Sequence, residues 1–166
     1  MGTTGAGKTT IGTMLAAQLN WQFADADTFH PGSNIEKMSH GVPLNDADRV
    51  PWLEAMHKAI LEWIAARNNV VLACSALKRA YRRELRPSPE VKIVYLRGDY
   101  ALFAERIRHR HGHFASEAIL AGQFADLEEP TDAINIAAAK LPQEIVAEIR
   151  KQLALSSDAP RAGADR

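Results

Sequence analysis

The chain has little cysteine and no long apolar run. Cys74 is the single cysteine among its 166 residues, so no internal disulfide can form, and we expect a reducing, cytoplasmic location. The longest uninterrupted apolar run, residues 70–74, is far too short to cross a membrane. The sequence contains 6 histidines, but none has companion cysteines or histidines at zinc spacing, so we expect no zinc site.

The chain also has no net charge. Its 20 Lys and Arg residues balance its 20 Asp and Glu residues, whereas nucleic-acid-binding proteins usually carry a basic excess. We therefore expect no nucleic acid and no membrane among its partners, although a local cluster can still bind a small anion. A length of 166 residues with 46% hydrophobic content is typical of one globular domain. We place that domain at residues 1–155 and expect the polar tail, 156–166, to be disordered.

Helical and strand patterns alternate along this domain. Helical spacing of apolar residues begins after residue 10 and recurs over 51–64, 75–85, 99–110, 116–126 and from 142 onward. Residues 21–27, 70–74, 92–96 and 134–137 have the pattern of strands, while 30–50 are polar and turn-rich. Pro51 stands where a first helical residue is expected. The alternation predicts an α/β fold with a parallel sheet and helices on both faces.

The first ten residues carry the clearest chemical signal. Residues 2–9 match the pattern Gly-x-x-x-x-Gly-Lys-Thr, in which glycines and successive N–H groups wrap around phosphates ahead of a helix N-terminus. The alternative, a glycine-containing turn, is disfavoured by the Lys-Thr pair and the helix that follows. We expect Lys8 to reach the transferring phosphate and Thr9 to bind Mg²⁺, which predicts a P-loop phosphotransferase that binds a nucleoside triphosphate. The expected nucleotide-binding residues of the loop are Gly2, Thr3, Thr4, Gly5, Ala6, Gly7, Lys8, Thr9 and Thr10.

The strand that normally precedes such a loop is missing from the sequence. Only Met1 stands upstream of Gly2. We expect that the start of the chain was assigned too late, with absence of the strand as the alternative. A sheet without this strand would leave backbone groups of its neighbours unpaired.

Two further groups of residues point to phosphoryl transfer. Asp25 and Asp27 lie at the end of a predicted strand, where one carboxylate can hold Mg²⁺ and the other can accept a proton from a hydroxyl. The alternative is that Asp25 and Asp27 are simply two acidic residues of a solvated turn. Arg106 and Arg110 share a helical face just before a Gly-His-Phe break, which predicts a lid over the nucleotide at about 108–118. The alternative is a surface helix with two arginines.

The segment 78–86 is strongly basic. Most of its cations are expected to lie on a solvated helix surface. Lys78 is the exception, because it stands nearest the end of the 70–74 strand and could bind a carboxylate or phosphate there.

These motifs together resemble the gluconokinases of the P-loop type, over residues 2 to about 130. The matching residues, beyond the loop, are His30-Pro31, Asn34, Lys37-Met38, Gly41, Pro43-Leu44-Asn45-Asp46-Ala47-Asp48-Arg49-Val50-Pro51-Trp52-Leu53, Cys74-Ser75-Ala76-Leu77-Lys78, Tyr81-Arg82, Gly112-His113-Phe114, Gln123-Phe124, Leu127-Glu128 and Pro130.

The resemblance implies a three-layer fold like that of the nucleoside monophosphate kinases, with a lid and with the first strand truncated here. It implies ATP-dependent phosphorylation of the 6-hydroxyl of D-gluconate by a cytoplasmic homodimer. Lys8, Asp27 and Arg110 are then the expected catalytic residues, and Arg106 and Arg110 join the loop in binding ATP. Thr9 and Asp25 would hold Mg²⁺. The expected gluconate-binding residues are Asp27, His30, Asn45, Arg49, Lys78, Arg82 and His113.

Three other functions are weighed against this one. The first is a kinase of another small hydroxy acid, such as shikimate, or a nucleotide kinase. Shikimate kinases share the loop and the paired acids, but they lack the segment 43–52. A non-catalytic nucleotide-binding regulator is disfavoured by the intact loop, acids and arginines. A nucleic-acid-binding module would rest only on the basic segment.

Overall fold

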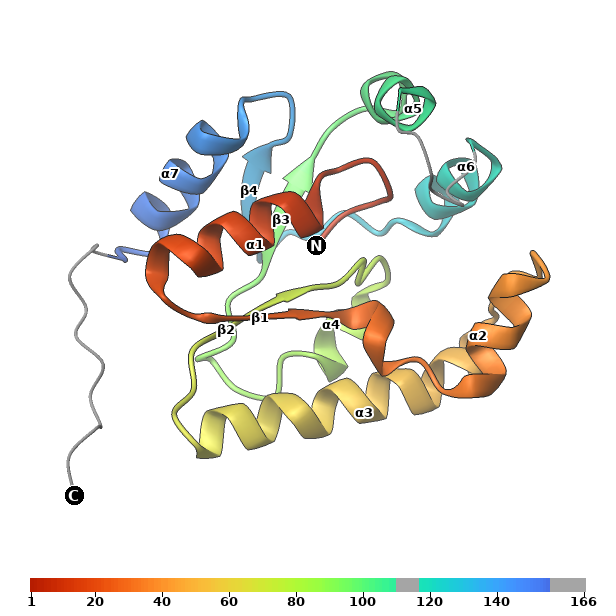
Figure 1. Ribbon diagram of the computed structural model, residues 1–166, viewed down its shortest axis with the longest axis horizontal. Helices are drawn as coiled ribbons and strands as arrows, with labels where there is room; N and C mark the ends of the chain where they lie inside the picture. Colours follow the sequence, from red (N-terminus) through yellow and green to blue (C-terminus); the bar gives the residue numbers. More distant parts are fainter. Residues whose placement is uncertain (110–116, 156–166) are drawn as a thin grey trace.

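A computed structural model describes residues 1–109 and 117–155 of the chain (Figure 1). The elements, in chain order, are α1 (Lys8–Leu19), β1 (Gln22–Asp25), the 3-10 helix η1 (Ala26–Phe29), α2 (Gly32–Ser39), α3 (Asp46–Ala65), β2 (Val70–Ala73), α4 (Arg79–Glu84), β3 (Val94–Arg97), α5 (Tyr100–Arg108), α6 (Glu117–Asp126), β4 (Ile134–Ala137) and α7 (Pro142–Gln152).

The strands form two parallel pairs. β1 pairs with β2, with Gln22 opposite Val70, and β3 pairs with β4, with Val94 opposite Ile134. Helices α1 and α7 lie on one side of these strands and α3 and α4 on the other (Figure 1). The predicted α/β fold with parallel strands between helical layers is therefore confirmed. No helix in the described part of the chain is long and apolar enough to cross a membrane.

Each helical layer has its own apolar core. Leu120, Ile136 and Val146 are fully buried in the core shared by α1, α5, α6, β4 and α7. Trp52 and Met56 of α3 are buried in the second core, together with residues of α4 and of the loop after β2. The second core holds α3 and α4, which carry the charged residues of the site described below.

The helix α3 begins earlier than its sequence pattern predicted. Its first residue is Asp46 rather than Pro51, because Asn45 and Asp48 form a capping box in which each side chain accepts a hydrogen bond from the other's backbone N–H. Pro51 lies inside the helix. Two other predictions were also inaccurate: α2 lies within the segment expected to be turns, and α4 is shorter than the predicted helix over 75–85.

The two strand pairs are separated by a gap between β2 and β3. Within residues 1–109 and 117–155, no strand lies in this gap; only Met1 and Gly2 enter it. The Met1 amine donates to the Val94 carbonyl, and the Leu96 N–H donates to the Met1 carbonyl at 3.0 Å. Met1 thus pairs with β3 as the residue of a parallel neighbouring strand would.

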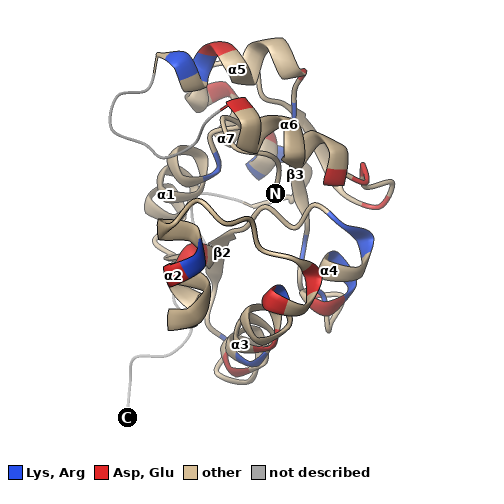
Figure 2. Ribbon diagram, turned by 90° about the vertical axis from the view of Figure 1, so that its right-hand side faces the viewer, with Lys and Arg blue, Asp and Glu red and all other residues tan. Residues whose placement is uncertain are grey.

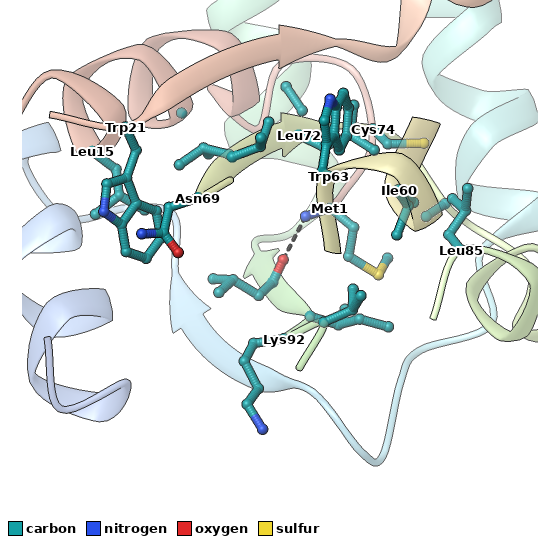
Figure 3. A pocket seen from close by; sticks show the side chains of 18 of the residues that line it. Met1, Leu15, Trp21, Ile60, Trp63, Asn69, Leu72, Cys74, Leu85 and Lys92 are labelled. Carbon is teal, nitrogen blue, oxygen red and sulfur yellow. Dashed lines mark hydrogen bonds between the residues drawn. The ribbon is translucent and has the colours of Figure 1, made fainter. Parts of the chain in front are cut away.

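A cavity of about 480 Å³ extends along the gap from Met1 (Figure 3). Its walls include Leu72 of β2 and Val94 of β3, with Leu15 of α1 and Trp63 of α3 from the two helical layers. This is the place where a central strand would join both pairs into one sheet. The four strands of the described residues therefore form two separate pairs with this cavity between them, rather than one continuous sheet.

The Met1 amine lies in an unfavourable place for a charge. Its pKa is lowered from an ordinary value of 8.0 to about 5, first because of burial and then because of the nearby charge of Lys8. The dashed line in Figure 3 marks the hydrogen bond of this amine. A peptide N–H at the same place would form the same bond without carrying a charge.

Candidate active site

The loop between Met1 and α1 depends on two glycines with positive φ. Gly5 has φ 80°, and a Cβ atom there would lie 3.0 Å from both the Cβ and the carbonyl oxygen of Phe103 on α5. Gly7 has φ 87° and is the N-cap residue of α1. Glycine is favoured at both positions, because other residues rarely adopt these angles. The turn delivers the chain to the N-terminus of a twelve-residue helix, where free N–H groups and the helix dipole favour an anion.

Lys8 and Thr9 are the first residues of α1. The Lys8 ammonium group folds back over the loop and donates to the Thr3 carbonyl at 2.9 Å. The Thr9 hydroxyl donates to a carboxylate oxygen of Asp25 at 3.3 Å. That bond connects the phosphate loop to the C-terminal end of β1, so the structure brings together the two residues predicted to hold Mg²⁺.

Asp25 is oriented from a second direction as well. Its other carboxylate oxygen accepts the Asp27 N–H at 3.1 Å, which caps η1 and turns the chain immediately after β1. A hydroxyl and a carboxylate are hard oxygen ligands that suit Mg²⁺, which commonly keeps several waters and binds substrate phosphates. No group of three or more His, Cys, Asp or Glu residues that could hold a metal occurs among the described residues. The two residues therefore fit an ion bound together with a nucleotide rather than a dedicated protein cage.

The segment that carries Asp27 is fixed on α3. The Trp52 indole N–H donates to the Ala26 carbonyl at 2.7 Å, and the Trp52 ring stacks on His30 with centroids 4.7 Å apart. Burial lowers the pKa of His30, an effect that the charge of Asp27 opposes and that of Arg49 reinforces. His30 was predicted to bind gluconate, and with its pKa lowered it would do so as a neutral hydrogen-bonding group near pH 7.

Arg49 and Lys78 come from different elements and meet at one carboxylate. Lys78 donates to both oxygens of Asp46, at 2.8 and 2.9 Å, and Arg49 approaches the same group at 3.4 Å. The Tyr81 hydroxyl also donates to Asp46. These hydrogen bonds, first from Lys78 and then from Tyr81, lower the pKa of Asp46, and Asp46 in turn raises the pKa of Lys78. Figure 2 shows basic and acidic residues together on α3 and α4.

A second carboxylate faces the same two cations. Asp126, the last residue of α6, lies 3.8 Å from Arg49 and 3.9 Å from Lys78. We call Asp46, Arg49, Lys78, Tyr81 and Asp126 the charged cluster. The two acids and Tyr81 were not among the predicted site residues, although Asp46 and Tyr81 stand within the motifs that match the gluconokinases.

Several other predicted site residues have different positions. Arg82 was expected to bind substrate, but it is buried and donates to the carbonyls of Ala76 and Leu77 at 3.0 and 2.6 Å. Its guanidinium group therefore stabilises the loop after β2. Asn45 was expected to contact gluconate, but its side-chain oxygen accepts the Asp48 N–H and caps α3.

Only one of the predicted lid arginines is described. Arg106 donates to the Gly5 carbonyl at 3.4 Å and to the Ala138 carbonyl at 2.7 Å, so it lies beside the phosphate loop. Arg110, His113 and most of the predicted lid lie outside the described residues.

Comparison with known proteins identifies the family. A family model described as shikimate kinase matches residues 4–154. A gluconokinase of Gluconobacter oxydans is 42% identical over 153 residues, which cover 90% of this chain and 86% of the relative. The thermosensitive gluconokinase of Escherichia coli is 45% identical over 131 residues, covering 78% of this chain and 70% of the relative.

The chain belongs to the gluconokinase family. A solved structure of a gluconokinase from Sinorhizobium meliloti superposes with a TM-score of 0.82 at 40% identity, covering 93% of this chain and 89% of that one. The gluconokinase resemblance and the P-loop kinase fold predicted from the sequence are thereby confirmed.

Proposed function

We propose that the chain transfers the γ-phosphoryl group of ATP to the 6-hydroxyl of D-gluconate, giving 6-phosphogluconate and ADP. The observation that carries the proposal is the 3.3 Å hydrogen bond between Thr9 and Asp25. It joins the Lys-Thr pair of a phosphate loop to paired carboxylates, the arrangement that phosphoryl transfer to a hydroxyl needs. The choice of acceptor is supported by membership of the gluconokinase family.

The nucleotide half of the site consists of the loop 2–10 and the first turn of α1. Its N–H groups and the Lys8 ammonium group bind the phosphates of ATP. Arg106 lies beside the loop, and we propose that with Arg110 it neutralises charge on the transferring group. Thr9 and Asp25 would hold Mg²⁺, which supplies positive charge against the phosphate oxygens when bound.

The acceptor half begins at Asp27. Its carboxylate accepts the proton of the gluconate 6-hydroxyl as that oxygen forms a bond to the γ-phosphorus. The bond between the γ-phosphorus and the β,γ-bridging oxygen breaks, and ADP leaves. Arg49 and Lys78 are well suited to bind the gluconate carboxylate, because both cations already converge on a carboxylate in this structure. Neutral His30 can hydrogen-bond a hydroxyl.

Other parts of the proposal concern the whole protein. We propose that 108–118 form a lid that includes His113 as a substrate contact, and that 1–155 act as one kinase domain. We also propose a cytoplasmic homodimer, which light scattering of the purified chain would test. Neither a nucleic acid nor a membrane is proposed as a partner.

The acceptor can be tested with ADP release measured over a panel of hydroxy acids. The panel contains gluconate, other sugar acids and shikimate, because the matching family model is described as shikimate kinase. The proposal expects gluconate to give the highest kcat/KM. Preference for shikimate would establish the second candidate function, and ATP binding without turnover on any acceptor would indicate a regulator.

A further inference from the structure

The helix α6 touches both halves of the site through two side chains. The Gln123 carboxamide oxygen accepts the Thr4 N–H of the phosphate loop at 2.6 Å. Three residues later, Asp126 faces Arg49 and Lys78. Residues three apart lie on the same face of a helix, so one face of α6 spans from the loop to the charged cluster.

The position of α6 is fixed by its apolar residues. Leu120 is fully buried, and Phe124 packs on Phe103 and Tyr100 of α5, with centroids 6.1 and 5.5 Å apart. With the helix anchored in this way, Asp126 is held near the two cations, while its side chain keeps 41% of its exposure to solvent. Asp126 can therefore turn away from the cations without any movement of α6.

The charge of Asp126 does not stabilise its own helix. A carboxylate at the last residue of a helix faces the negative end of the helix dipole, which is unfavourable. The two cations are its favourable contacts, at 3.8 and 3.9 Å. Asp46, by contrast, is held by hydrogen bonds from Lys78 at 2.8 and 2.9 Å. Of the two acids, Asp126 is bound less closely and is the easier one to displace.

We propose that Asp126 is an internal competitor for the carboxylate-binding cations, displaced when an anionic acceptor binds to Arg49 and Lys78. This inference rests on the proposed function, because it takes the acceptor to be a sugar acid. Asp126 thereby sets the affinity for the acceptor without taking part in transfer. Since Gln123 on the same helix bonds to the phosphate loop, α6 contacts both the acceptor and the nucleotide halves.

The test is Asp126→Asn, which keeps the shape of the side chain and removes its charge. The matched control is Asp132→Asn, the same change at an exposed aspartate outside the charged cluster. Asp132 forms an ion pair with Arg86 at 2.8 Å. For Asp126→Asn we expect the Kd of gluconate, measured by calorimetry, and its KM to fall about two- to fivefold, the size of a partly exposed ion pair. The kcat and the KM for ATP should stay within error of the parent, and Asp132→Asn should change neither constant for gluconate.

The outcomes separate this inference from the proposed function. An unchanged gluconate Kd in Asp126→Asn would overturn the competition, and a raised Kd would show that Asp126 binds the acceptor instead. Either result can occur in a fully active gluconate kinase. If the parent chain neither binds nor phosphorylates gluconate, the proposed function itself fails. A thermal melt of each variant checks that a change in Kd does not come from partial unfolding.

Discussion

The buried amine of Met1 makes a quantitative prediction about stability and pH. Its pKa is about 5 in the folded chain, against 8.0 for an exposed amine. A base with a lowered pKa in the folded state binds its proton more readily when unfolded. The contribution of this amine to the free energy of unfolding is therefore highest above pH 8, decreases as the pH falls, and reaches its minimum below about pH 5.

The size of the loss follows from the two pKa values. Linkage gives a decrease of about 2 kcal/mol in the free energy of unfolding between pH 8 and pH 6, for a chain that begins at Met1. The perturbation is an upstream extension of about five alternating apolar and β-branched residues, the length of an average strand. The extension replaces the amine by a peptide N–H, which can still donate to Val94 and carries no charge.

The assay is urea unfolding of both chains at pH 8 and pH 6. Every other titrating group is the same in both chains, so the extended chain serves as the control for them. One such group is His30, whose lowered pKa also decreases the free energy of unfolding as the pH falls. We expect the extended chain to lose about 2 kcal/mol less than the parent over this interval. It should also be more stable at both pH values, because its strand fills the cavity between β2 and β3 and pairs with their free edges. Equal pH dependence in the two chains would refute the reasoning.

Three further predictions concern single residues. Asp27→Asn should lower kcat by about 10²- to 10⁴-fold, the usual contribution of a general base, while the Kd of ATP from calorimetry stays unchanged; near-normal turnover would remove Asp27 from its assigned role. Arg49→Ala should raise the KM of gluconate by about tenfold or more, because a charged hydrogen bond is lost, with little effect on the KM of ATP; equal effects on both would contradict a role specific to the acceptor. Met56→Ala should lower the free energy of unfolding by about 2–5 kcal/mol in urea titrations, because Met56 of α3 is fully buried in the second core. A loss under about 1 kcal/mol would mean that the second core can collapse around the missing atoms.

Features that depend on neighbouring residues were predictable from the sequence. The phosphate loop, the helix after it and the strand Ile134–Ala137 follow from short-range patterns, and the structure confirms their locations. The gap between β2 and β3 also agrees with the sequence, because a loop of this kind normally follows a buried strand. The start of α3 was misplaced because Pro51 was given more weight than the capping pair Asn45 and Asp48.

Features that depend on distant contacts were not predictable. Basic residues alone do not reveal whether a side chain faces substrate or a backbone carbonyl. Arg82 and Lys78 stand four residues apart in one basic segment, yet one is buried against the loop after β2 and the other belongs to the charged cluster. Asp126 of α6 approaches Arg49 of α3 and Lys78 although these residues are far apart in the sequence, a contact that no local pattern encodes.

The proposed reaction moves a phosphoryl group onto the primary hydroxyl of gluconate. The most direct measurement is phosphorus NMR of a reaction containing the chain, Mg²⁺, ATP and gluconate, with proton coupling used to identify the esterified carbon. We expect one equivalent of a phosphate monoester at carbon 6 for each ADP formed, and formation about 10²- to 10⁴-fold slower with Asp27→Asn. Release of inorganic phosphate without a sugar-acid ester, or an ester on a different carbon, would contradict it.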